Sequence, residues 1–165
     1  MPLDTIKCLK AAERRVIERT NAGALDHSEY NLSFKCHYSG TLGEWAVCKA
    51  YGCKWDGEYF EGEEWEERKR LGIWDTAVGE VRATRRPDLA GGMPLYPTDD
   101  QVNAPYIWVT LYTKSKRIIQ AKLVGWIMRK DGVKSKWWGE DYWGKKCWIV
   151  PKDKLLGMEL LPTQT

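Results

Sequence analysis

The sequence predicts an α+β domain in which two N-terminal helices cover a central mixed sheet. Residues 4–19 and 40–52 combine helical apolar spacing with capping signals. Residues 106–112 and 118–128 are rich in β-branched and aromatic residues and flank a short polar turn, which is typical of an antiparallel pair. Because 165 residues is an ordinary length for one globular unit, we expect a single domain over residues 1–165.

The composition is that of a globular protein whose charges are unevenly placed. Hydrophobic residues make up 43% of the chain, which excludes a disordered protein, and the net charge is only +3. The basic residues gather in two groups, at Arg82, Arg85 and Arg86 and at Lys114, Lys116 and Arg117. Acidic residues gather at 58–67, so a nearly neutral total is compatible with a local positive face.

The cysteines indicate reduced thiols rather than a disulfide framework. There are five of them, an odd number without C-x-x-C spacing. Cys36, His37, Cys48 and Cys53 also offer four zinc ligands, although their spacing matches no standard zinc motif. No stretch reaches the ~20 apolar residues of a membrane span and no apolar signal core opens the chain, so we expect a cytoplasmic protein with no membrane partner.

The first half of the chain is expected to be helical, with a loop between two helices. Asp4 caps the first helix, and residues 26–39 are polar and broken, which favours a loop. Thr41 and Glu44 have the spacing of a capping box for the second helix, which Gly52 ends. Capping alone accounts for Glu44; the alternative places its carboxylate on a helix packed against the sheet.

The remaining segments carry weaker signals. Residues 53–60 are typical of a short strand and turn, and the charged residues 58–71 of a solvated loop or helical turn. Four prolines and a glycine pair predict a loop at 87–105. Residues 148–150 are expected to form a short strand, and the apolar residues of 154–161 to pack back onto the domain.

Residues 72–86 hold the most informative pattern. Two short apolar pieces flank a small-residue link, as in a turn between strands. Glu80 and Arg82 are two residues apart on a strand and share a face, and a closed turn brings Asp75 near them. Two carboxylates and a cation on a sheet outline a metal-dependent phosphodiester site, but also an ordinary exposed hairpin with a salt bridge.

These motifs resemble those of the PD-(D/E)XK nuclease-like superfamily, in particular a small phage-encoded branch of it, over about residues 10–160. The resemblance is carried by Gly40-Thr41-Leu42-Gly43-Glu44, Asp75, Glu80-Val81-Arg82, Gly125-Trp126-Ile127 and Trp148-Ile149-Val150-Pro151. It implies a restriction-endonuclease-like core. It also implies that Glu44, Asp75 and Glu80 form a catalytic set that holds one or two divalent cations, Mg²⁺ or Mn²⁺.

Arg82 stands where this superfamily has a lysine. Arginine stays charged and does not act as a general base, but it can hold the scissile phosphate and stabilise developing charge. Arg85 and Arg86 lie just beyond and are expected to contact flanking phosphates of DNA. Trp137 and Trp138 are expected to stack on bases of an opened strand, or alternatively to form a lid or a core plug.

The resemblance thus implies a divalent-metal-dependent DNA nuclease of phage type, acting in the cytoplasm of the host cell. Two alternatives stay open. Arg82 in place of lysine motivates a catalytically inactive relative that binds nucleic acid. The small size, the ten tryptophans and the acidic stretch 58–67 motivate a phage protein that contacts a host defence protein.

Overall fold

The computed structural model describes residues 5–21, 30–55, 57, 62–71, 73–88, 90–99, 103–115 and 117–162. Its helices are α1 (Thr5–Asn21), α2 (Tyr30–Tyr51), α3 (Gly62–Arg70) and α4 (Arg129–Gly132). Its strands are β1 (Glu80–Thr84), β2 (Gly92–Leu95), β3 (Pro105–Lys114), β4 (Arg117–Met128), β5 (Trp138–Glu140) and β6 (Lys146–Pro151), and short 3-10 turns follow α4 and β6. The predicted α+β class is confirmed.

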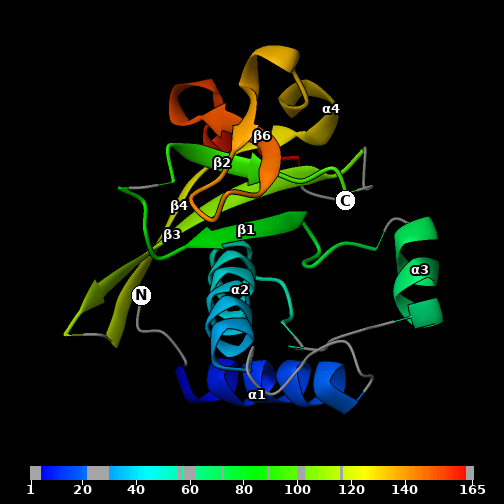
Figure 1. Ribbon diagram of the computed structural model, residues 1–165, viewed down its shortest axis with the longest axis vertical. Coiled ribbons are helices and arrows are strands. Elements are labelled where there is room, and N and C mark those ends of the chain that lie inside the picture. The colour runs from blue at the N-terminus through cyan, green and yellow to red at the C-terminus, as the bar shows by residue number, and fades with distance from the viewer. Residues whose placement is uncertain are drawn as a thin grey trace.

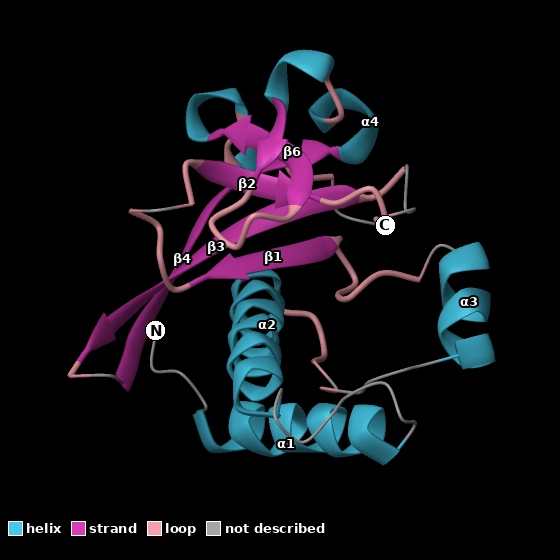
Figure 2. Ribbon diagram, viewed as in Figure 1, coloured by secondary structure: helices cyan, strands magenta, loops and turns pink. Residues whose placement is uncertain are grey.

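The described residues form two sheets, whereas the sequence predicted one. The first has the order β1-β3-β4, with β1 parallel to β3 and β3 antiparallel to β4, so the predicted mixed sheet is confirmed. The second is antiparallel, with the order β2-β6-β5, and lies over the first (Figure 2). The prediction of a loop throughout 87–105 is therefore wrong, because Gly92–Leu95 pairs with β6 despite containing a proline.

The N-terminal helices form successive layers below the first sheet. α2 runs from β1 down to α1, which crosses its far end (Figure 1). The predicted loop at 26–39 is wrong where the structure describes it, because α2 already begins at Tyr30. Phe34 and Tyr38 are one helical turn apart and their rings stack with centroids 6.1 Å apart, which supports this extra helix.

The longer helix also overturns the predicted capping box. Thr41 lies inside α2, where its hydroxyl lies 3.1 Å from the carbonyl oxygen of Tyr38 and 3.2 Å from that of Cys8. Glu44 is buried in the same helix, so it does not cap a helix start. The alternative, in which Glu44 lies on a helix packed against the sheet, is the one observed.

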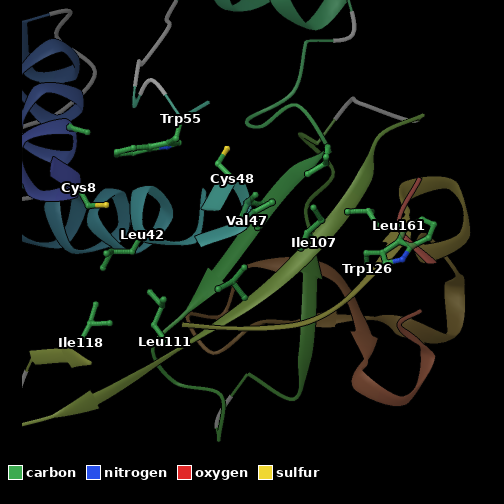
Figure 3. Packing of buried hydrophobic residues seen from close by; sticks show 14 residues of the cluster. Cys8, Leu42, Val47, Cys48, Trp55, Ile107, Leu111, Ile118, Trp126 and Leu161 are labelled. Atoms are coloured by element: carbon green, nitrogen blue, oxygen red, sulfur yellow. The ribbon is translucent and has the colours of Figure 1, made fainter. Parts of the chain in front are cut away.

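The two faces of the first sheet pack against different layers. Val81, Ile107 and Val109 face α2 in the cluster drawn in Figure 3. Tyr106 and Trp108 face the second sheet, where they pack on residues such as Met93, Leu95 and Val150. Because Glu80 and Arg82 are the register partners of Tyr106 and Trp108, these two side chains also lie on the second-sheet side.

The first helix, the later strands and the C-terminal segment agree with their predictions. α1 confirms the first helix, although Asp4 lies outside the described residues. β3, β4 and β6 confirm the three strands predicted after residue 105, and buried Leu161 confirms that the C-terminal segment packs back.

The segment between α2 and β1 differs in part from its prediction. The predicted strand at 53–60 is wrong for residues 53–55; Asp56 and residues 58–60 lie outside the described part. The charged segment forms α3, which is the helical alternative. Among the helices that the structure describes, none has the length and apolarity needed to cross a membrane.

Candidate functional site

A tight turn places Asp75 beside β1. Thr76 N donates a hydrogen bond of 3.1 Å to Gly79 O, and Gly79 N donates one of 3.3 Å to Thr76 O. The Thr76 hydroxyl donates a further hydrogen bond of 2.8 Å to Gly79 O. Gly79 has φ 152°, and a β-carbon there would lie 2.4 Å from the carbonyl oxygen of Pro105, so this turn requires glycine. Closing the turn lets Asp75 Oδ2 accept a hydrogen bond of 3.0 Å from Val81 N.

Glu80 is a buried acid next to Asp75. Only 4% of its surface is exposed, and its Oε1 atom has no hydrogen-bond partner among the described residues. Burial first, and the negative charge of Asp75 second, raise the pKa of the Glu80 carboxyl to about 9. Hydrogen bonding to Asp75 contributes to this rise in the pKa, and at neutral pH Glu80 keeps its proton.

Arg82 is a fixed cation on the same face as Glu80. Its guanidinium pairs with Asp99 and lies 4.9 Å from the centre of the Tyr106 ring. Burial lowers the pKa of Arg82, but the charge and hydrogen bond of Asp99 outweigh burial and raise that pKa above its ordinary value. The sequence analysis did not identify Asp99, because it lies in the proline-rich segment after β2 and its partner, Arg82, is on β1, 17 residues away in the chain.

Glu44 lies on the other side of the first sheet and has partners of its own. Arg15 on α1 donates to both carboxylate oxygens at 2.7 Å, and Trp55 Nε1 donates to Oε2 at 3.2 Å. Burial raises the pKa of Glu44, the Arg15 charge opposes this, and the charge of Asp75 adds to the rise. The charge of Asp75 thus raises the pKa of both Glu44 and Glu80. No motif in the sequence identifies Arg15 and Trp55 as the partners of Glu44.

The predicted metal ligands do not gather into one group. In the part of the chain that the structure describes, no cluster of three or more His, Cys, Asp or Glu side chains could hold a metal ion. Of the three predicted ligands, Glu44 already accepts hydrogen bonds from Arg15 and Trp55 through its carboxylate oxygens.

The predicted zinc ligands Cys36, His37, Cys48 and Cys53 also form no metal-binding group among the described residues. Cys36 is exposed on α2, whereas Cys48 is buried with its Sγ 3.7 Å from the carbonyl oxygen of Lys54. All five cysteines are free thiols.

Of the residues predicted to contact DNA, Arg86 and Trp138 are exposed, whereas Arg85 and Trp137 are partly buried. Arg85 is held against α2 by a 2.5 Å hydrogen bond to Lys35 O, whereas Arg86 lies 3.5 Å from Asp88 and 5.7 Å from the Tyr142 ring centre. Trp137 is partly buried against the second-sheet core, which is the core-plug alternative. Trp138 is exposed and meets Trp148 edge-on at 4.8 Å.

No family model matches this chain, and no match was found among curated proteins or solved structures. The relation to the PD-(D/E)XK superfamily stays a prediction that rests on the motifs quoted above. Beside those motifs, the structure places the buried carboxyl of Glu80 next to the half-buried carboxylate of Asp75, and both lie near Arg82, which Asp99 holds in place.

Proposed function

We propose that this chain is a divalent-metal-dependent nuclease that hydrolyses phosphodiester bonds in DNA, with Asp75 and Glu80 at the centre of its site. The observation that carries the proposal is the buried, unpartnered Oε1 atom of Glu80 beside a second carboxylate. Two neighbouring carboxylates, one of them buried, repel each other when both are ionised. A divalent cation in place of the shared proton removes that repulsion, and carboxylate oxygens suit Mg²⁺ or Mn²⁺.

The donor set fits such a cation in part. Asp75 and Glu80 supply two carboxylates, whereas Glu44 would have to leave Arg15 before it could join them. In this arrangement the pair of Arg15 and Glu44 instead ties α1 to α2. Bound between Asp75 and Glu80, the cation would supply Lewis-acid activation of water and of the phosphate.

The basic residues of β1 and its end complete the proposed site. Arg82 is held by Asp99 on the Glu80 face, where its permanent charge favours the negative charge that develops on a phosphoryl oxygen. Arg86 has an exposed side chain just beyond the strand and supports a flanking phosphate.

The test is cleavage of linear, circular and branched DNA in Mg²⁺ and in Mn²⁺. We expect Asp75→Asn and Glu80→Gln to lower the rate by about 100-fold or more, because each removes charge from the proposed site. Glu67→Gln on α3 is the matched control, since its carboxylate is exposed, and it is expected to leave the rate unchanged. Absence of cleavage on every substrate, or full activity of Glu80→Gln, would refute the proposal.

A second candidate is a nucleic-acid-binding module without catalysis. It is favoured by the partners that Glu44 and Arg82 already have in Arg15 and Asp99. DNA binding whose affinity falls with salt, without turnover in either metal, would select this candidate over the first. The host defence partner stays a prediction, since no contact in the structure bears on it.

A further inference from the structure

The turn between β5 and β6 presents two aromatic rings to solvent. Tyr142 is 52% exposed and Trp143 is 69% exposed. Their ring centroids lie 5.1 Å apart in an edge-to-face arrangement. Exposing adjacent large rings costs hydrophobic free energy, so this pair is a candidate contact surface rather than part of a core.

The turn is held rigidly by one carboxylate. Asp141 Oδ1 accepts hydrogen bonds from Trp143 N at 2.9 Å and from Lys145 N at 2.8 Å. Asp141 Oδ2 accepts a third from the Tyr96 hydroxyl at 2.7 Å. The backbone that carries the two rings is therefore set in advance, which lowers the entropy lost when a ligand binds.

The surrounding segment is basic. From Arg129 to Lys154 the chain has eight basic and four acidic residues, an excess of +4 against +3 for the whole protein. Lys145 lies 5.3 Å from the centre of the Tyr96 ring, at the base of the same turn. Exposed aromatic rings among positive charges fit a polyanion with accessible flat bases better than they fit an acidic or apolar protein surface.

Contacts connect this turn to Arg82 and Arg86 of the candidate site. The Arg86 guanidinium, just past β1, lies 5.7 Å from the centre of the Tyr142 ring. On a second route, Tyr96 binds Asp141 through its hydroxyl and donates its backbone N–H to Asp99 at 2.6 Å, and Asp99 pairs with Arg82. The two rings are therefore linked by short contacts to both arginines of the candidate site, Arg82 and Arg86.

We propose that Tyr142 and Trp143 form a stacking platform for unpaired bases, so that the preferred substrate is single-stranded DNA or a branched DNA with a single-stranded arm. This deepens the proposed function and rests on it for the nucleic-acid partner. A duplex hides the faces of its bases, so exposed rings gain stacking only from a strand that is open. The lysines and Arg86 supply the contacts to its phosphates.

The experiment measures binding separately from cleavage. A fluorescently labelled oligothymidine is titrated with protein in EDTA, and anisotropy gives the Kd. Trp143→Ala is expected to weaken binding about tenfold, which is about 1.4 kcal/mol, and Trp143→Phe to stay near the parent. Tyr112→Ala is the matched control, because Tyr112 is an exposed aromatic residue near the far end of β3.

An abasic strand of the same length tests whether stacking is the cause. Its affinity is expected to be equal for the parent and for Trp143→Ala, because it has phosphates but no bases. The proposal is overturned if Trp143→Ala and Tyr142→Ala leave the oligothymidine Kd unchanged. It is also overturned if Trp143→Ala weakens binding of the abasic strand as much as binding of oligothymidine. Duplex DNA that binds as tightly as oligothymidine and depends on the same two rings would overturn it as well.

The two proposals fail in different ways. If oligothymidine binding depends on Trp143 but no DNA is cleaved in Mg²⁺ or Mn²⁺, the platform stands and the nuclease does not. If DNA is cleaved with no dependence on Trp143 for any substrate, the nuclease stands and the platform does not. Circular dichroism and thermal melts confirm that each variant is folded.

Discussion

Replacing Glu80 by glutamine tests the electrostatics on which the candidate site depends. The amide has the shape of the protonated acid but carries no charge at any pH. The pKa of Glu80 in the folded protein is about 9, against an ordinary value of 4.5 in the unfolded chain. Between these values the folded protein binds one proton more than the unfolded chain, so the free energy of unfolding falls as pH rises.

The magnitude follows from the linkage relation. Inside this window each pH unit changes the folding constant by roughly tenfold, which is about 1.4 kcal/mol. Between pH 5 and pH 8 the Glu80 contribution therefore sums to about 3–4 kcal/mol. Glu44 also has a raised pKa, but it is present in both proteins, so the difference between parent and variant isolates Glu80.

The assay is urea unfolding of the parent and of Glu80→Gln at several pH values from 5 to 8, in EDTA. We expect similar stability near pH 5 and a growing advantage for the variant towards pH 8. Millimolar Mg²⁺ or Mn²⁺ should reduce the pH dependence of the parent alone, because a cation between Asp75 and Glu80 replaces the proton. A constant difference between the two proteins across this range would refute the account of Glu80.

Three further predictions concern stability and are checked by urea unfolding. Arg15→Met should lower the free energy of unfolding by about 3–5 kcal/mol, because it leaves the buried Glu44 carboxylate without its partner at 2.7 Å. Arg70→Ala, which removes an exposed ion pair, should lower it by less than about 0.5 kcal/mol. Equal losses in the two variants would contradict this account. Gly43→Ala should cost about 1–3 kcal/mol, since its β-carbon would lie 2.8 Å from a side chain of β1, whereas Gly40→Ala, with its nearest neighbour at 3.9 Å, should be neutral or stabilising. Asp141→Ala should cost about 1–3 kcal/mol and raise amide hydrogen exchange in the β5–β6 turn, and unchanged exchange would argue against a rigid turn.

The approach of Asp75 to Glu80 could be predicted because it depends on neighbours in the chain. The predicted turn closes between Thr76 and Gly79 and brings Asp75 to the backbone of Val81, and the period of two along β1 places Glu80 and Arg82 on one face. The predicted strand at residues 73–74 is wrong, because these residues form no strand and β1 pairs with β3 instead. The capping box of Thr41 and Glu44 failed for the opposite reason. The same residues can also occur inside a longer helix, and here the helix extends back to Tyr30, with Tyr38 packed against the core.

The sequence by itself determined the first helix, the antiparallel pair of β3 and β4 and the common face of Glu80 and Arg82, since local periodicity and turn chemistry encode these features. Only the tertiary structure decided that Glu44 pairs with Arg15, 29 residues away, and that Arg82 pairs with Asp99. It also decided that Trp137 is partly buried while Trp143 is exposed. These outcomes depend on how distant elements pack, and no spacing between neighbouring residues encodes that.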